Sequence, residues 1–163
     1  MSKTFNVLVL CTGNSARSIL GEMLFNHLGK GRIKAYSAGS KPGGVVNPVA
    51  LDTLAEHGVP CEGARSKSWD EFAVSSAPTF DFIFTVCGNA AAETCPVWPG
   101  HPTTAHWGIP DPAHVDPMAA RREAFEDAYQ SLKKRIEAFL ALPLEAMTPQ
   151  ESALAARRIH TGD

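Results

Sequence analysis

Residues 5–18 read FNVLVLCTGNSARS, and this stretch decides the fold class. The run 5–11 is short, apolar and rich in β-branched side chains, which is typical of a buried parallel strand. Residues 12–14 interrupt it with a glycine. The segment 16–28 follows, with Arg17 near its start and with apolar side chains that recur at helical spacing. A strand that turns through a glycine-containing loop into a helix predicts an α/β unit with its ligand site at that turn.

The remainder of the chain repeats this alternation of strands and helices. Strands are predicted at 33–38, 80–87 and 103–108, and a helix is predicted at 49–57 behind Asn47-Pro48. No internal repeat, linker or low-complexity segment interrupts the pattern. Because helical connections between parallel strands cover both faces of a sheet, the pattern predicts a three-layer α/β sandwich.

The C-terminal third carries the clearest helix signals. Asp116 is expected to cap a long helix that has Pro117 at its first position and that ends at Pro143. An apolar stripe at helical spacing predicts its buried face, formed by Phe125, Tyr129, Leu132, Ile136 and Phe139. Residues 148–151 (TPQE) resemble a capping box, which predicts a short additional helix.

Size and charge are those of an ordinary soluble domain. The 163 residues predict one catalytic α/β domain over 1–147 and a mostly polar helical tail over 148–163 that is prone to fraying. A formal net charge of −2 offers neither a basic surface for nucleic acid nor a polybasic patch for a membrane. The longest apolar run, 7–10, is far shorter than the roughly 20 residues of a membrane span. With no secretory signal before it, we expect a cytoplasmic protein, and with no unexplained apolar stripe, a monomer.

The cysteines at positions 11, 61, 87 and 95 indicate catalytic or redox use. Cytoplasmic thiols stay reduced, so a permanent disulfide framework is not expected. Taken alone, Cys87 is better explained as a buried strand residue and Cys95 as a surface thiol, and Cys61 lies in a turn as a bystander. A zinc site is a minor alternative, since the spacing does not fit known zinc fingers, and its candidate ligands are Cys87, Cys95, His101 and His106.

Each residue type in the turn after the first strand has a physical reason to be there. The loop amides and the start of the helix form an anion cradle, and the guanidinium of Arg17 matches two oxygens of a tetrahedral oxyanion. The same positive field lowers the pKa of the Cys11 thiol from its ordinary value of about 8.5, and the Ser18 hydroxyl can donate to the thiolate. A Walker A loop is excluded because Gly-Lys-Ser/Thr is absent. The expected oxyanion-binding residues are Thr12, Gly13, Asn14, Ser15, Ala16, Arg17 and Ser18.

The run 9–18, VLCTGNSARS, resembles the phosphate loop of low molecular weight protein tyrosine phosphatases and of the arsenate reductases that share their fold. The resemblance extends from residue 5 to about residue 140 and implies a four-stranded parallel sheet with flanking helices. It also implies that Cys11 is the nucleophile and that a late Asp-Pro pair supplies the general acid, which Asp111-Pro112 fits. An acid at that position protonates the leaving oxygen, although a plain turn is the other interpretation of this proline-rich stretch.

Local features favour the reductases over the phosphatases. Where the phosphatases typically have a second cysteine in the loop, this chain has Ala16. Where they usually follow the acid pair with an aromatic residue, it has Ala113. Two segments resemble the reductases instead, namely 85–96 (TVCGNAAAETCP) and 106–112 (HWGIPDP).

The resemblance implies a relay of three cysteines. Cys11 attacks arsenate to give a thiol–arsenic(V) adduct, and Cys87 then attacks the Cys11 sulfur and releases arsenite. Cys95 next attacks Cys87 and carries the disulfide outward, where thioredoxin reduces it by thiol–disulfide exchange. Glutathione or a glutaredoxin-type protein is the other donor considered, and no bound cofactor is expected.

Some members of the family bind a potassium ion beneath the loop. Asn14 and Glu22 match that site, but Lys67 falls where an acidic ligand is wanted. Because a lysine ammonium can replace the cation, we expect no required metal.

The sequence therefore predicts a cytoplasmic arsenate reductase that retains some phosphatase activity. The first alternative is a protein tyrosine phosphatase whose distal cysteines only protect Cys11 from oxidation. The second is a non-catalytic module that binds oxyanions or senses redox state. Such a module has no use for Asp111 or Cys87 at their positions.

Overall fold

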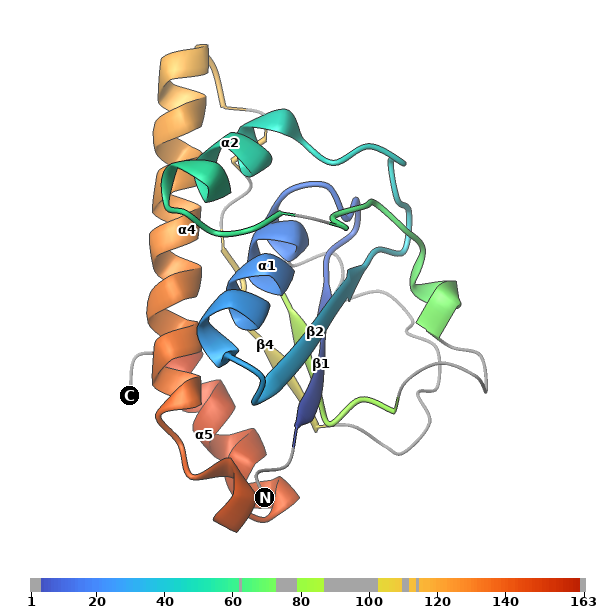
Figure 1. The fold of residues 1–163 in the computed structure, drawn as a ribbon, viewed down its shortest axis with the longest axis vertical. Helices are drawn as coiled ribbons and strands as arrows, with labels where there is room; N and C mark the ends of the chain where they lie inside the picture. The colour runs from blue at the N-terminus through green and yellow to red at the C-terminus, as the bar shows by residue number, and fades with distance from the viewer. Residues whose placement is uncertain are drawn as a thin grey trace.

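The computed structural model describes residues 4–61, 63–72, 79–86, 103–109, 112–113 and 115–161. Figure 1 shows α1 lying across the sheet and α4 running beside it along the length of the molecule. The elements in chain order are β1 (Phe5–Leu10), α1 (Arg17–Gly29), β2 (Ile33–Ala38), α2 (Pro48–Glu56), the 3₁₀ turn η1 (Trp69–Phe72), β3 (Phe82–Thr85), β4 (Thr103–His106), α4 (Met118–Leu140), the 3₁₀ turn η2 (Leu144–Ala146) and α5 (Pro149–Thr161).

The four strands form one parallel sheet in the order β2-β1-β3-β4, as predicted. The first strand is central, with Val7 opposite Ala35 of β2 on one side and Phe82 of β3 on the other. The chain leaves β1 toward β2 and later returns on the opposite side of β1 to form β3. The carboxyl end of β1 is therefore the topological switch point, where open α/β sheets bind their ligands.

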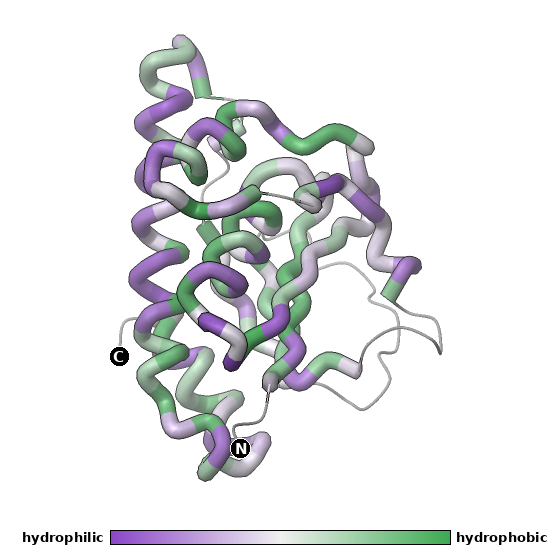
Figure 2. Tube along the Cα trace, in the orientation of Figure 1, coloured by the Kyte–Doolittle hydropathy of each residue, from purple (hydrophilic) through white to green (hydrophobic). Residues whose placement is uncertain are grey.

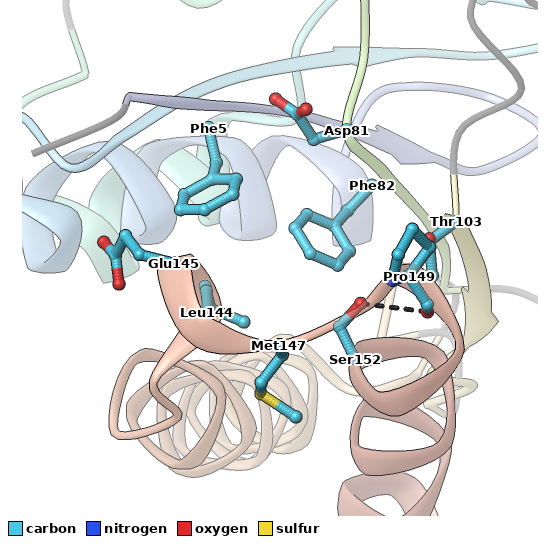
Figure 3. A pocket seen from close by; sticks show the side chains of 9 residues that line it. All are labelled: Phe5, Asp81, Phe82, Thr103, Leu144, Glu145, Met147, Pro149 and Ser152. Atoms are coloured by element: carbon cyan, nitrogen blue, oxygen red, sulfur yellow. Dashed lines mark hydrogen bonds between the residues drawn. The ribbon is translucent and has the colours of Figure 1, made fainter.

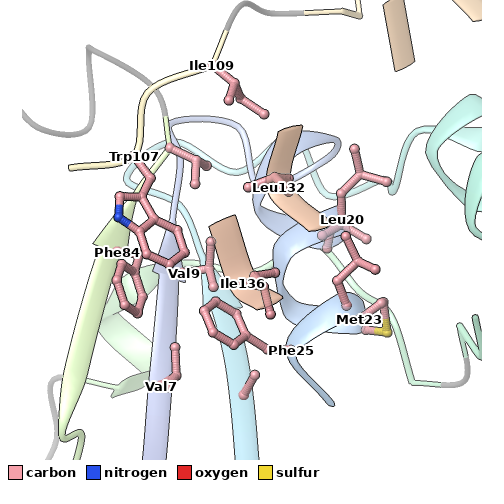
Figure 4. Close-up of a cluster of buried hydrophobic side chains, with 14 of the residues drawn as sticks. Val7, Val9, Leu20, Met23, Phe25, Phe84, Trp107, Ile109, Leu132 and Ile136 are labelled. Carbon is pink, nitrogen blue, oxygen red and sulfur yellow. The ribbon is translucent and has the colours of Figure 1, made fainter. Parts of the chain in front are cut away.

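Alternation along β1 divides the apolar core between the two faces of the sheet. Val7 and Val9 belong to the large cluster that α1 and α4 cover, which Figure 4 shows in close-up. Leu8 and Leu10 belong to a smaller cluster on the other face, together with side chains of η1. Both faces of the sheet are thus packed, as the predicted sandwich requires.

The long helix α4 has the predicted buried stripe but a different start. Figure 2 shows hydrophilic residues interspersed with hydrophobic ones along α4, and the apolar side chains of the stripe are buried. The predicted cap Asp116 is wrong, because Pro117 occupies the N-cap position after a cis Asp116-Pro117 bond. The Asp116 carboxylate instead accepts a bond from Arg121 Nη2 at 2.7 Å. The carboxylate is therefore paired with a side chain of the first turn and leaves the helix N–H groups to other partners.

The helix α5 opens with the predicted capping box and packs on the sheet. The Glu151 N–H donates to Thr148 Oγ1 at 3.1 Å, and the Thr148 N–H donates to Glu151 Oε1 at 2.8 Å. Ser152 and Ala156 are buried, so α5 is held more firmly than its polar sequence suggests. Among the helices of the described ranges, none combines the length and the apolar content that crossing a membrane requires.

The strands are shorter than their sequence patterns. The patterns predict 80–87 and 103–108, whereas the ladder is confined to β3 and β4 at Phe82–Thr85 and Thr103–His106. Phe80 is buried in the smaller cluster against Tyr36 and Phe72 without being part of a strand. Burial rather than pairing therefore explains its apolar character.

Candidate functional site

The turn that follows β1, residues 11–18, is called the anion loop below. Cys11 is its first residue, is buried, and continues the β1–β2 ladder through its N–H to Ala38 O at 3.2 Å. Asn14 has a φ of 45°, a left-handed conformation that lets the chain reverse within the loop. Ala16 is the N-cap of α1, and the first turn of α1 contains no acidic residue. The positive end of the helix dipole is therefore not neutralised by a carboxylate of its own helix.

The carbonyl groups of the anion loop are bonded to the segment 41–47, which is called the support segment. The bonds are Lys41 N–H to Thr12 O at 3.0 Å, Gly43 N–H to Gly13 O at 3.2 Å and Asn47 N–H to Ser15 O at 2.8 Å. Because the C=O and N–H of a trans peptide point in opposite directions, these bonds turn the loop amides away from the support segment.

Those amides have no protein partner within the part of the chain that the structure describes. The N–H groups of Gly13, Asn14, Ser15 and Ala16 donate to no acceptor there. Buried or half-buried amides without a partner are uncommon in native proteins, and several of them at a helix start are the usual device for binding an anion. Within the described ranges, the backbone of residues 13–16 therefore has the free donors that the predicted anion cradle requires, and anion binding itself stays a prediction.

A glycine at the end of β2 permits the close approach that shapes the loop. A Cβ atom on Gly39 would lie 2.4 Å from Thr12 O and 2.7 Å from Cys11 O. Gly39 is itself fixed on both sides, since its N–H donates to Lys67 O at 3.0 Å and its carbonyl accepts from Trp69 N at 2.9 Å. No side chain can be accommodated there without moving the start of the anion loop.

A buried polar network lies beneath the loop. Asn14 Nδ2 donates to Ser18 Oγ at 2.8 Å and to Ser37 Oγ at 2.9 Å, and Asn14 Oδ1 accepts from the Lys67 N–H at 2.8 Å. The Ser37 hydroxyl donates to the Glu22 carboxylate. These bonds occupy both N–H donors of the Asn14 amide and its oxygen, which explains how the left-handed turn is held.

The ammonium of Lys67 completes this network. Its Nζ lies 3.7 Å from Glu22 Oε1 and 3.4 Å from Ser37 Oγ, and it donates to Arg65 O at 3.0 Å. Burial raises the pKa of Glu22, and the charge of Lys67 partly offsets that rise. Burial likewise lowers the pKa of Lys67, against the opposing charge of Glu22. The two charges are thus buried as a pair.

The sequence predicted three of the residues in this network but missed a fourth. Asn14, Glu22 and Lys67 lie together as expected, but Ser37 was not anticipated as their common partner. Its signal was a hydroxyl at the carboxyl end of β2, next to the end of β1. Across the described ranges, no cluster of three or more His, Cys, Asp or Glu residues has the geometry to hold a metal ion.

Arg17 connects the anion loop to the segment that follows β4. Its Nη1 donates to Ile109 O at 3.0 Å, two residues before Asp111 in the sequence. Asp111, Cys87 and Cys95 lie outside the described residues, so their predicted roles stay predictions. Ser18 is fully buried, and because it accepts from Asn14, its own proton is available for a second bond.

Cys61 and His57 lie elsewhere and have structural surroundings. Cys61 is half-buried, with its Sγ 3.4 Å from Val59 O, and burial raises the pKa of this thiol. His57 stacks on the ring of Tyr129 and bonds to Glu126 at 2.8 Å, which joins α2 to α4. Neither residue contacts the anion loop through any of these bonds, which is consistent with the bystander role expected of Cys61.

A pocket of about 260 Å³ lies at the opposite end of the sheet, where the strands begin. Figure 3 shows Phe5 and Phe82 on one side of it and residues of η2 and α5 on the other. It contains none of the site residues predicted from the sequence. The anion loop, rather than this pocket, is the candidate functional site.

Known proteins resemble this chain over most of its length. Residues 6–152 match the family of low molecular weight phosphotyrosine protein phosphatases. An arsenate reductase from Shouchella clausii is 34% identical over 140 residues, which cover 85% of this chain and 96% of the relative. A solved arsenate reductase from Archaeoglobus fulgidus superposes with a TM-score of 0.60 at 33% identity, covering 80% of this chain and 98% of that one.

A thioredoxin-dependent arsenate reductase from Corynebacterium glutamicum is similar as well. It superposes with a TM-score of 0.56 at 25% identity over 83% of this chain and 63% of its own. The fold, the anion loop and these similarities agree, and the chain belongs to the low molecular weight phosphotyrosine protein phosphatase family.

Proposed function

We propose that the chain is an arsenate reductase that uses Cys11 as its nucleophile and the anion loop as its oxyanion site. One observation carries the proposal: within the described part of the chain the amides of residues 13–16 have no protein partner, and they lie in the loop that joins the buried Cys11 to α1. A tetrahedral oxyanion is the ligand that such a cradle accepts. The similarity to arsenate reductases, rather than the cradle, favours arsenate over a phosphate ester.

The first step forms a bond between Cys11 sulfur and arsenic. The Cys11 thiolate attacks arsenic, Asp111 donates one proton to a hydroxyl group of hydrogen arsenate, the As–O bond to that group breaks, and it leaves as water. Arg17 and the loop amides hold the remaining oxygens and the negative charge that gathers on them. Arsenic is still in the +5 state after this step.

The next steps transfer two electrons. The Cys87 thiolate attacks Cys11 sulfur, the new S–S bond forms, and the electron pair of the S–As bond leaves with arsenic as arsenite. Cys95 then attacks Cys87 sulfur and releases the Cys11 thiolate. An external dithiol reduces the Cys87–Cys95 disulfide, which restores the enzyme.

We further propose thioredoxin as the donor, with a glutaredoxin-type protein as the alternative. A similar reductase is thioredoxin-dependent, which supports the first choice. A relay of this kind needs free thiols, so we place the enzyme in the cytoplasm. We also propose that it acts as a monomer without a bound cofactor or metal. A phosphate monoester would enter the same cradle, so a residual phosphatase activity is expected.

The test is arsenate turnover with thioredoxin, thioredoxin reductase and NADPH. We expect NADPH oxidation that requires arsenate and that disappears in both Cys87→Ser and Cys95→Ser. Cys61→Ser is the matched control and is expected to retain wild-type turnover, because Cys61 lies outside the anion loop.

The variants also separate the alternatives. Loss with Cys87→Ser but not with Cys95→Ser would identify a small-thiol donor that intercepts the relay earlier. Absence of arsenate-dependent oxidation with every donor, beside aryl phosphate hydrolysis that neither change affects, would establish a phosphatase. Retained arsenate binding without any turnover in the wild type would establish a binding module.

A further inference from the structure

Three consecutive carbonyl groups after β4 accept hydrogen bonds from arginines of different helices. Arg135 of α4 donates through Nη1 to Trp107 O and to Gly108 O, both at 3.2 Å. Arg17 of α1 donates to the next carbonyl, Ile109 O, at 3.0 Å. Residues 107–109 are therefore tied through their carbonyls to both long helices of the large core.

The other side of the same backbone is fixed to β3. The Trp107 N–H donates to Thr85 O at 2.7 Å, and the Ile109 N–H donates to Val86 O at 3.1 Å. Gly108 lies so close to the His106 ring that a Cβ would be 2.6 Å from His106 Nε2. Both edges of the 107–109 backbone are thus held, although the segment belongs to no strand.

The indole of Trp107 adds a third attachment, to α5. Trp107 is fully buried and packs at a tilt against Phe84, with ring centroids 4.0 Å apart. Its Nε1 donates to Ala156 O at 2.8 Å. Figure 4 shows Trp107 and Ile109 at the edge of the large core, near Leu132 and Ile136 of α4. Ala156 lies beyond residue 152, where the family match ends, so this attachment uses a part of the chain that the match does not cover.

The charge of Arg135 is unusual in its surroundings. It is half-buried, burial lowers its pKa, and no carboxylate within the described ranges forms an ion pair with it. Packing alone is better served at that position by an apolar side chain. The guanidinium of Arg135 instead contributes two hydrogen bonds to the backbone of residues 107–108.

We propose that Arg135 is a positioning residue: it fixes the backbone of residues 107–109, from which the chain continues to the general acid. The hydrogen bond between Trp107 and α5 assists it. This rests on the proposed function, in which Asp111 protonates the leaving oxygen. Asp111 follows Ile109 by two residues, a distance that a chain spans with about 7 Å at most. Ile109 is therefore the last described residue before the proposed acid, and its carbonyl is held by Arg17 of the oxyanion site.

The test compares two aryl phosphates that depend differently on a general acid. Phenyl phosphate has a strongly basic leaving group that needs protonation, whereas p-nitrophenyl phosphate has a weakly basic one that needs it little. A general acid contributes about 10²–10⁴-fold. For Arg135→Met we expect kcat/KM to fall by about tenfold for phenyl phosphate and by less than about threefold for p-nitrophenyl phosphate, because a displaced acid loses part of that contribution.

Further variants keep the test sharp. Arg135→Lys retains a donor and is expected to recover part of the lost kcat/KM. Trp107→Phe is expected to lower kcat/KM more for phenyl phosphate than for p-nitrophenyl phosphate, as Arg135→Met does, but by less. Lys134→Met, at the exposed neighbouring position of α4, is the control and is expected to match wild type for both esters. Asp111→Asn gives the full split and serves as the reference.

Each failure has its own signature. Equal loss for both esters, or no loss, in Arg135→Met beside a clear split in Asp111→Asn would overturn the positioning role and leave the proposed acid intact. No split in Asp111→Asn would overturn the acid itself and with it this inference. If the wild-type protein cleaves neither ester, arsenate turnover is the readout instead, and an unchanged kcat/KM for arsenate in Arg135→Met would overturn the positioning role.

Discussion

Replacing Lys67 by methionine tests whether the buried network supports the anion loop. The change retains a side chain of similar length but removes the ammonium that lies 3.7 Å from Glu22 Oε1. It also removes the donors to Ser37 Oγ and to Arg65 O. Glu22 is then a buried carboxylate that retains the hydroxyl of Ser37 as its donor.

The size of the effect follows from this geometry. Two unit charges 3.7 Å apart attract by about 4 kcal/mol at an effective dielectric constant of 20. Desolvation of the ammonium offsets part of that attraction in the native protein. Breaking a buried pair by removing one partner typically costs about 3–5 kcal/mol, and we expect about 3 kcal/mol of unfolding free energy to be lost at pH 8.

The loss depends on pH in a definite direction. Burial already raises the pKa of Glu22 above 4.5, and without Lys67 the pKa rises further. A carboxyl group with a raised pKa binds its proton more tightly in the folded state, so stability falls as pH rises from 4.5 through the folded-state pKa. The deficit of Lys67→Met relative to wild type is therefore smaller at pH 5 than at pH 8.

Urea unfolding at both pH values measures this deficit. Glu22→Gln in the Lys67→Met background is expected to recover at least about 1 kcal/mol at pH 8, because it removes the unpaired charge. Lys134→Met is the exposed control and is expected to change stability by less than about 0.5 kcal/mol. A Lys67→Met protein with wild-type stability at both pH values would refute the argument that the pair is buried and coupled.

Other predictions address the loop, the thiols and the C-terminal helix. Gly39→Ala is expected to lower kcat/KM for arsenate more than about tenfold, because its Cβ would meet Thr12 O at 2.4 Å; steady-state kinetics at unchanged far-ultraviolet circular dichroism would check it. Burial raises the pKa of Cys61, so iodoacetamide at pH 7.5 is expected to modify this thiol more slowly than the thiol of a free cysteine peptide, as mass spectrometry would show. Thr148→Ala removes the acceptor of the Glu151 N–H and is expected to reduce stability by about 1 kcal/mol in urea unfolding, with little change in turnover. Exchange of potassium for tetramethylammonium in the buffer is expected to change turnover less than about twofold, because the Lys67 ammonium already lies beside Glu22 and Ser37; a larger loss would indicate a required cation.

Local sequence signals were sufficient for the sheet and for the anion loop. A short β-branched run, a glycine turn and a helical repeat act within neighbouring residues, so β1, α1 and the amides of 13–16 follow from adjacent positions. The resemblance to the family began with this contiguous stretch, and the match over residues 6–152 confirms it.

Contacts between distant segments were not predictable in the same way. Ser37 is 15 residues from Glu22 and 30 from Lys67, and only the packing of β2 beside β1 brings them together. Arg135 follows two lysines on α4, so from the sequence alone it is indistinguishable from a residue on a solvated helix face. Only the folded structure shows its contact with the backbone of residues 107–109. Asp116 has the residue type of a cap, but its pairing with Arg121 depends on a local backbone geometry that composition does not reveal.

The support segment has a consequence for how this site can diverge. Its bonds to the anion loop are made by the backbone N–H groups of Lys41, Gly43 and Asn47, so they do not depend on which side chains those positions carry. Only proline, which has no N–H, is barred by that contact. Val45, between them, has 71% of its surface exposed. The side chains of the support segment can therefore change in size and charge while its backbone continues to hold the anion loop in the same shape.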